Sequence, residues 1–235
     1  MMKYQSCTDV KIGDINYLTE FSGDAPNTLY VIRGQQGDML IDTGFITTYK
    51  PLLRWIRSNG FNITDIFLTH AHPDHDWNAA KFKKLFNARI WLNDKDVSLI
   101  RNFSSQPQKP LDERFVKRVK WISFWTGTFI KSKRYQPDVI ISGDDSETPR
   151  KYGYDFKIFE FPGHTLGSMG ILQGDTLYCG DAFVIFNGEP SLPVHAASLE
   201  LMRASAEKIR VLAPRFIACG HGLPTECDKI SWYEN

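Results

Sequence analysis

The chain has 235 residues, of which 42% are apolar and 23% charged, and its formal net charge at pH 7 is +1. These values are typical of a soluble globular protein, and the small charge gives no global field that would attract nucleic acid or an anionic membrane surface. No run of about 18 apolar residues occurs, so we expect no membrane span.

The cysteine pattern and the first residues bear on the cellular compartment. The first fourteen residues, MMKYQSCTDVKIGD, have no apolar core of the kind that an export signal needs. Cys7, Cys179, Cys219 and Cys227 form no Cys-x-x-Cys pair and no dense framework. We therefore expect reduced thiols in a cytoplasmic protein.

The first half of the chain reads as a hairpin followed by alternating helices and strands. Residues 29–33 and 39–42 are apolar, β-rich runs separated by a glycine-bounded segment, which predicts the hairpin. Residues 47–59 carry apolar side chains at helical spacing and end at Gly60, which predicts a helix. A strand at 63–69, a helix around 79–86 and a strand at 88–92 follow.

The second half repeats this order. Strands are expected at 156–161, 169–173 and 176–179, the last two joined by a tight turn at Gly174–Asp175. A helix at 199–212 and a closing strand at 215–218 complete the series. Two similar halves packed sheet against sheet, within a single domain over residues 1–235, fit this order.

Residues 101–136 differ from the rest, since they hold nine Lys or Arg residues and seven aromatic ones. One interpretation is an amphipathic helical insertion whose aromatic side chains pack on the body and whose basic residues face water. A second is a cover over the active site that shapes a pocket for an apolar or acidic substrate. Contact with a membrane surface is a third.

Half of the six histidines lie in one short segment, LTHAHPDHD, at the end of a predicted strand. His70 and His72 are two residues apart, so in an extended segment they project to the same side. Pro73 then turns the chain, and Asp74 and His75 begin the next helix. Imidazole and carboxylate groups gathered in this way form the ligand set that suits Zn²⁺ and similar cations.

The motif His70-x-His72-x-Asp74-His75 resembles the signature of the metallo-β-lactamase fold superfamily. Four further segments are similar to that family's motifs, in the family's order: LIDTG (40–44), FPGHTLGS (161–168), YCGDAF (178–183) and CGHG (219–222). The resemblance implies an α/β fold of four layers, an αβ/βα sandwich, here with the helical insertion at 101–136.

The resemblance also implies a binuclear metal site with seven ligands. One cation would be held by His70, His72 and His164, the other by Asp74, His75 and His221, and Asp181 would bridge them. Two cations about 3.5–4 Å apart would share a water and lower its pKa toward about 7, which makes a bridging hydroxide the nucleophile. Asp74 could also orient that hydroxide or relay a proton. Zinc is the expected metal, with manganese or iron as alternatives.

Several other residues are candidates for supporting roles. Asp42 is the first candidate to accept a hydrogen bond from a metal-binding imidazole. Thr69, Thr165 and Ser168 could orient neighbouring ligands, or could simply make turn and strand-end hydrogen bonds. The sixth histidine, His195, either faces the cavity as a substrate contact or proton donor, or caps and packs. Cys179 and Cys219 are expected to be buried strand residues and not ligands.

These expectations lead to a metal-dependent hydrolase that acts on a small-molecule ester, thioester or lactone. A small-molecule phosphodiesterase and a mononuclear iron oxidoreductase on the same fold are the alternatives. The usual glyoxalase II form is not expected, because only about fourteen residues follow His221, too few for the C-terminal helical domain that the resemblance associates with it. No nucleic-acid partner is expected, and the sequence leaves a homodimer open.

Overall fold

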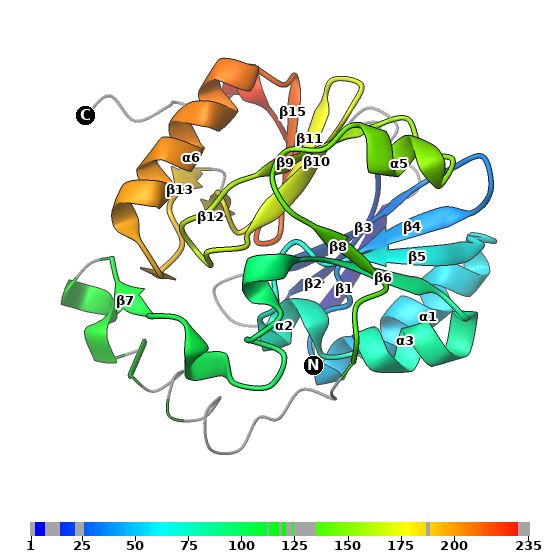
Figure 1. Cartoon of the computed structure of the whole chain (residues 1–235), viewed down its shortest axis with the longest axis horizontal. Coiled ribbons are helices and arrows are strands. Elements are labelled where there is room, and N and C mark those ends of the chain that lie inside the picture. Colours follow the sequence, from blue (N-terminus) through cyan, green and yellow to red (C-terminus); the bar gives the residue numbers. More distant parts are fainter. Residues whose placement is uncertain are drawn as a thin grey trace.

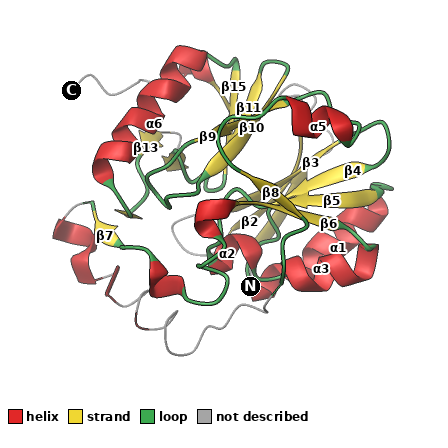
Figure 2. Cartoon of the chain, viewed as in Figure 1, coloured by secondary structure: helices red, strands yellow, loops and turns green. Residues whose placement is uncertain are grey.

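The structure is a computed structural model in which residues 3–7, 15–21, 26–111, 113–117, 119, 120, 124, 135–186 and 189–229 are described. Two β-sheets lie face to face, with helices on the outer face of each sheet (Figure 1). Figure 2 shows the same arrangement with the strands in yellow and the helices in red. The chain therefore has the four-layer αβ/βα architecture that the motif resemblance implies.

The first sheet has seven strands in the order β1-β2-β3-β4-β5-β6-β8. Strands β1 to β4 pair antiparallel, whereas β4, β5, β6 and β8 pair parallel. All six side chains of β3 are buried, as expected for a strand covered on both faces. The bounds are β1 Lys3–Cys7, β2 Asn16–Phe21, β3 Asn27–Ile32, β4 Asp38–Ile41, β5 Ile63–Phe67, β6 Arg89–Asn93 and β8 Val139–Ile141.

The second sheet has five strands in the order β16-β15-β11-β10-β9. Strands β11 and β15 pair parallel, and the other neighbours pair antiparallel. Residues 174 and 175 make the tight turn between β10 and β11 that the sequence predicts. The bounds are β9 Lys157–Glu160, β10 Met169–Gln173, β11 Thr176–Gly180, β15 Phe216–Cys219 and β16 Thr225–Glu226.

Three apolar clusters hold the layers together. One lies between the sheets and joins side chains such as Ile41 and Trp91 of the first sheet to Met169 and Tyr178 of the second. Another joins the outer face of the first sheet to helices α1 (Tyr49–Ser58) and α3 (Ala79–Phe86). The third covers the second sheet with helix α6 (Leu199–Leu212). Burial of apolar area at these three interfaces is the main force that fixes the sandwich.

Helix α6, the longest whose bounds the described residues give, is set by its sequence at both ends. The Ser198 hydroxyl accepts a hydrogen bond from the Leu201 amide and caps the first turn. Met202, Ser205 and Ile209 are buried at spacings of three and four residues, so one face packs on the second sheet. Ala213 adopts the left-handed conformation that ends the helix.

Short elements complete the described residues. Those before residue 120 are η1 Ile46–Thr48, α2 Pro73–Asp76, η2 Asp94–Asp96, η3 Phe103–Ser105, β7 Lys109–Pro110 and η4 Glu113–Phe115. Those after it are α5 Glu147–Lys151, β12 Val184–Phe186, β13 Glu189–Ser191, β14 His195–Ala196 and η5 Cys227–Lys229. β12 pairs with β13, and β14 pairs with β7.

The predicted insertion at 101–136 is only partly described, because residues 112, 118, 121–123 and 125–134 lie outside the described set. Between 101 and 115 the chain forms two 3₁₀ turns and strand β7, and not a continuous helix. Pro107 and Pro110 disfavour a helix there, since proline lacks the amide proton that a helix needs. Among the described residues no helix is long and apolar enough to cross a membrane.

Candidate metal centre

The predicted ligands lie where strands of both sheets end. The HAHPDH segment follows β5, Asp181 follows β11 and His221 follows β15, while His164 lies in the loop between β9 and β10. Asp42, the candidate supporting residue, follows β4. The carboxyl ends of parallel strands meet at one edge of a sheet, which is where α/β proteins place their sites. The fold thus brings all seven predicted ligand side chains to one place.

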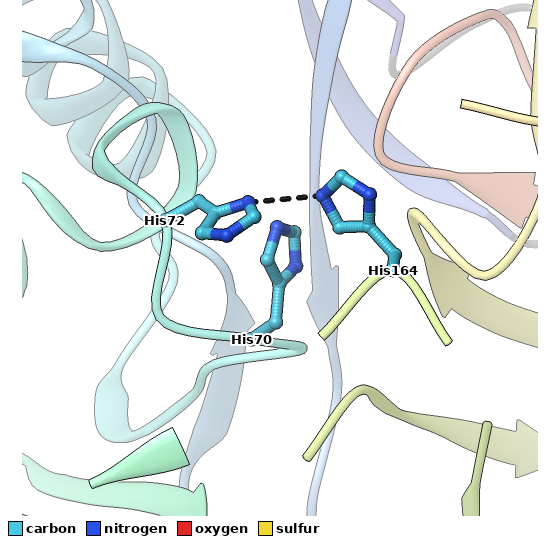
Figure 3. Close-up of side chains that lie close together, drawn as sticks. All are labelled: His70, His72 and His164. Carbon is cyan, nitrogen blue, oxygen red and sulfur yellow. Dashed lines mark hydrogen bonds between the residues drawn. The ribbon is translucent and has the colours of Figure 1, made fainter. Parts of the chain in front are cut away.

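Three of the imidazoles form a compact group. The candidate ligand atoms of His70, His72 and His164 lie within 4.8 Å of one another, and all three side chains are buried. Nε2 of His164 is 2.9 Å from Nδ1 of His72 (Figure 3). Figure 3 shows the three rings pointing toward one another from two separate segments of the chain.

A second group adjoins the first. The candidate ligand atoms of Asp74, His75 and His221 also lie within 4.8 Å of one another, as do those of His70, His75 and Asp181. The Asp181 carboxylate is 3.4 Å from Nε2 of both His75 and His221. The same carboxylate is 3.5 Å from Nε2 of His164. Asp181 therefore lies between the two groups and contacts both.

Burial and mutual repulsion keep the first group neutral. Burial, with the neighbouring imidazoles, holds the pKa of His70 and of His164 well below the usual range. Burial and the ring of His195 do the same to the pKa of His72. Three neutral imidazoles therefore face one another with their lone pairs available, the arrangement that a cation stabilises.

In the second group, nearby carboxylates outweigh the effect of burial on the histidine pKa values. Burial alone would lower the pKa of His75, but the carboxylates of Asp181, Asp42 and Asp74 together raise it to about 10. Burial likewise opposes protonation of His221, and the carboxylates of Asp181 and Asp74 outweigh it and raise its pKa. Positive charge is thus stabilised at the place where a second cation would lie.

Several buried polar atoms of the site have no hydrogen-bond partner in the part of the chain that the structure describes, and their types show whether these residues fit a metal. Nε2 of His70, Nε2 of His75 and Oδ1 of Asp181 are buried and have no hydrogen-bond partner among the described residues. Buried polar atoms in native proteins are usually paired, and unpaired ones cost free energy. Three such atoms, all of types that ligate metals, converge here, so the residues present fit divalent cations.

Asp42 accepts hydrogen bonds from residues of the site, including a metal-ligand candidate, as the sequence predicts. Its Oδ2 accepts hydrogen bonds from Nδ1 of His75 and from the hydroxyl of Thr69, each at 2.8 Å. Its Oδ1 accepts from the Thr69 amide at 2.8 Å. The His75 contact leaves Nε2 of that ring directed at Asp181. Asp42 has a φ of 58°, a conformation that Asp and Asn tolerate better than most residues.

The hydroxyl residues have divided roles. The Thr69 hydroxyl lies 3.1 Å from Nδ1 of His70, so it orients that ring. The Thr165 hydroxyl instead contacts Ser168 at 2.8 Å and donates to Asp96 at 2.7 Å. Thr165 and Ser168 therefore shape the loop that carries the predicted ligand His164, and they make these contacts within its turn.

Asp96 is a supporting residue that the motifs do not reveal. Its carboxylate accepts from the Ala71 amide at 3.2 Å and from the Gly167 amide at 2.9 Å. It also accepts from Thr165, and from the side chain of Gln106 at 2.9 Å. It thus ties the HAHPDH segment to the loop that carries His164. A buried carboxylate just after a strand is the signal that could have suggested it.

Asn27 is the other missed residue. Its side-chain amide donates to the Asp74 carbonyl at 2.7 Å. Its backbone forms an isolated bridge with His221. Strand β3 thereby connects two segments that carry predicted ligands, a role that no local pattern around residue 27 indicates.

Gly220 lets Asp181 and His75 approach each other. A Cβ at this position would lie 2.5 Å from Oδ1 of Asp181 and 2.6 Å from Cε1 of His75. Any larger side chain would therefore displace one of these groups. Glycine at 220 is a condition for the geometry of the site.

The two cysteines next to the site are buried, as predicted. Cys179 lies in β11 and Cys219 in β15, and their sulfur atoms are 3.7 Å apart as free thiols. Both belong to the apolar cluster under α6. The groups of candidate ligands among the described residues contain neither of them.

Comparison with known proteins places this geometry in a family. YobT of Bacillus subtilis, an uncharacterized protein, is 25% identical over 222 residues, 87% of each chain. Hydroxyacylglutathione hydrolase of Pseudomonas fluorescens is 26% identical over 179 residues, which cover 73% of this chain and 52% of that enzyme. The solved structure of TTHA1623 in a di-iron-bound form has a TM-score of 0.63 at 20% identity and covers 89% of this chain and 93% of that chain, a likeness of fold.

Residues 22–221 match the family described as "Metallo-beta-lactamase superfamily". That range includes both sheets' site-bearing loops and ends at the last predicted ligand. The chain belongs to the metallo-β-lactamase superfamily.

Proposed function

We propose that this chain is a dinuclear metal-dependent hydrolase. In this proposal one cation is held by His70, His72 and His164, and the other by Asp74, His75 and His221. The observation that carries it is the position of the Asp181 carboxylate, 3.5 Å from Nε2 of His164 and 3.4 Å from Nε2 of His75. A carboxylate has two oxygens and can join two cations, whereas one imidazole nitrogen can bind only one.

The donor set supports zinc as the metal, with manganese and iron as the alternatives. Imidazole nitrogens and carboxylate oxygens suit all three cations, so the set alone does not select between them. When bound, divalent cations supply Lewis-acid activation of water and of the substrate's polar oxygen. The hydrogen bonds made by Nδ1 of His75 and Nδ1 of His164 favour the tautomers in which Nε2 carries the lone pair that a cation binds.

Asp74 is the predicted ligand most open to solvent, with 44% of its side chain exposed, whereas the His75 side chain beside it is fully buried. Its Oδ2 lies 3.3 Å from Nε2 of His221. A carboxylate at the mouth of the site can hold a water or carry a proton to bulk solvent, and we assign that role to Asp74.

We propose a carboxylic ester, thioester or lactone of a small molecule as the substrate. The similarity to enzymes named hydroxyacylglutathione hydrolase, 26% identical in two species, supports acyl chemistry. The relative from Methanocaldococcus jannaschii named as a probable metallo-hydrolase supports hydrolysis more generally. We further propose that the protein acts in the cytoplasm, on the basis of its free thiols.

The test begins with metal analysis by mass spectrometry on protein expressed without added metal. We expect about two equivalents of zinc per chain, as in two-metal hydrolases. A panel of chromogenic esters, lactones, thioesters and phosphodiesters then defines the activity. One equivalent of iron with a visible absorption band would replace this proposal with a mononuclear oxidoreductase, and turnover of phosphodiesters alone would change the substrate class.

Two variants and a matched control locate the activity. Asp181→Asn should lose bound metal and reduce hydrolysis about 100-fold or more, as removal of a major electrostatic group from a reacting centre does. His72→Ala should do the same. Asp144→Asn makes the identical chemical change at an exposed carboxylate paired with Lys208, and should keep metal and activity. Equal activity in Asp181→Asn and Asp144→Asn would refute the proposal.

A further inference from the structure

His195 is the one histidine outside the predicted ligand set, and its backbone is held on two sides. It begins β14, where it pairs with Pro110 of β7. Just after it, the Ala197 amide donates to the Gly163 carbonyl at 2.8 Å. The His195 carbonyl accepts from Nδ1 of His164 at 3.0 Å. The position of its side chain is therefore fixed relative to the first group of imidazoles.

The His195 ring lies directly beside that group. It is stacked on His72, with ring centroids 5.5 Å apart and an interplanar angle of 29°. Its centroid is 4.8 Å from that of His164. Even so, His195 belongs to none of the three groups of candidate ligands found among the described residues. It is a neighbour of the proposed metal ligands without being one.

Both ring nitrogens of His195 lack a hydrogen-bond partner within the described part of the chain, and only 8% of the residue is exposed. A neutral imidazole offers one N–H donor and one lone pair, and native proteins rarely bury both without partners. A histidine that only packed or capped would be expected to make at least one of these bonds. The unused donor and acceptor instead point to a partner from outside the chain.

An apolar contact accompanies this polar group. The ring of Phe103, from η3, lies 4.9 Å from the ring of His72. Phe103 is held there by its segment, since the Gln106 side chain accepts from the Leu166 amide at 2.7 Å and donates to Asp96 at 2.9 Å. His72 is thus bordered by one aromatic ring that cannot hydrogen-bond and one imidazole that can.

We propose that His195 is a substrate-binding residue: its imidazole hydrogen-bonds a polar group of the substrate beside the His70–His72–His164 group, and Phe103 packs on the adjoining apolar part. This inference rests on the proposed hydrolase function. Among the esters, thioesters and lactones already proposed, it favours those with an apolar acyl portion next to the scissile bond. It also gives the described part of the predicted insertion a role in specificity.

The test compares His195→Phe with His195→Gln in zinc-loaded protein. Phenylalanine keeps an aromatic ring on His72 and removes both nitrogens, whereas glutamine restores a donor and an acceptor. We expect both variants to retain the wild-type metal content. His195→Phe should lower kcat/KM about 10- to 100-fold, the range for leaving a hydrogen-bonding group of the substrate unpaired, and His195→Gln should recover most of that loss.

Phe103→Ala provides the matched comparison on the apolar side. Across a series of esters with lengthening acyl chains, it should flatten the dependence of kcat/KM on chain length. His195→Phe should instead lower every ester by a similar factor, because the hydrogen bond does not depend on chain length. A His195→Phe variant with unchanged kcat/KM, or one that loses metal as His72→Ala does, overturns the inference.

A binding readout separates this inference from the hydrolase proposal. With ¹⁵N-labelled histidine, the ring signal absent from His195→Gln identifies His195, and addition of hexanoate, a simple acyl product, should shift it. An unshifted His195 signal in a protein that hydrolyses esters overturns the inference alone. A wild-type protein that hydrolyses nothing in the panel overturns the proposed function and this inference with it.

Discussion

Asp42 and His75 are joined by a 2.8 Å hydrogen bond between Oδ2 and Nδ1, although 33 residues separate them in the chain. The bond connects the residue after β4 to helix α2, which follows β5, and these two strands are parallel neighbours in the first sheet. Because Nδ1 is engaged, Nε2 of His75 faces Asp181. The orientation of a predicted ligand is therefore set by a residue that does not itself enter the site.

Asp42→Asn tests this relationship without altering the backbone, since asparagine also tolerates the φ of 58° found there. We expect affinity for the second metal to fall about 10- to 100-fold, the range for loss of a group that orients a ligand. Calorimetric titration of metal into the metal-free protein measures it. Wild-type affinity at both sites would show that Asp42 has only a structural role.

Gly220→Ala tests the close approach of Asp181 and His75. The added methyl would lie 2.5 Å from the Asp181 carboxylate, so one ligand must move and the second metal should bind about 10- to 100-fold more weakly. Metal stoichiometry after dialysis reports this. Gly174→Ala is the control: nothing lies within 4 Å of a Cβ there, so it should lose about 1–2 kcal/mol of stability from its positive φ and keep both metals.

Asp96→Asn should weaken metal binding by the first group of predicted ligands, because Asp96 joins the two segments that carry them. The amide can replace only part of the four hydrogen bonds that the carboxylate accepts, so we expect about 1–3 kcal/mol of stability to be lost. Metal occupancy should fall along with stability. Asp94→Asn, two residues earlier at an exposed carboxylate, should change neither quantity. Denaturant unfolding and metal analysis of both variants decide the matter.

Asp65 provides a prediction about acid stability. It is fully buried and accepts from Arg89 at 2.7 and 2.8 Å, from Trp91 at 2.7 Å and from the Tyr154 hydroxyl at 2.7 Å. Burial alone would raise the pKa of Asp65, but the hydrogen bonds from Arg89, Tyr154 and Trp91 outweigh it and lower the pKa. The ionised form is therefore the one that the fold stabilises.

Asp65→Asn should cost about 3 kcal/mol at pH 7, toward the lower end for breaking a buried ion pair, because Arg89 is itself partly exposed. The folded-state pKa of Asp65 lies below the ordinary aspartate pKa of about 3.9. The stability that ionised Asp65 contributes is therefore fully present above about pH 3.9 and is lost as pH falls through the folded-state pKa. Urea unfolding from pH 3 to pH 7 should show wild type and Asp65→Asn converging at the acid end. A gap that widens there would contradict the assignment.

Local sequence patterns were enough to predict several helices and strands and the candidate ligands. Helix α6 spans the predicted residues 199–212, and the hairpin of β3 and β4 follows from two apolar runs with a glycine-bounded turn. Local patterns suffice for these because backbone geometry and amphipathic spacing act over a few residues. The HAHPDH segment was recognisable for the same reason, because its predicted ligands lie close together in the chain.

Which distant groups meet, and which residues support them, depends on how the chain packs in three dimensions. Asp96 lies 25 residues after Ala71 and 69 residues before Thr165, yet it binds both, and no spacing rule connects them. The same holds for the hydrogen bond from Asn27 to the Asp74 carbonyl and for the His195 ring stacked on His72. Such contacts form because burial of apolar area packs the two sheets against each other. Local sequence patterns do not predict which residues this long-range packing brings into contact.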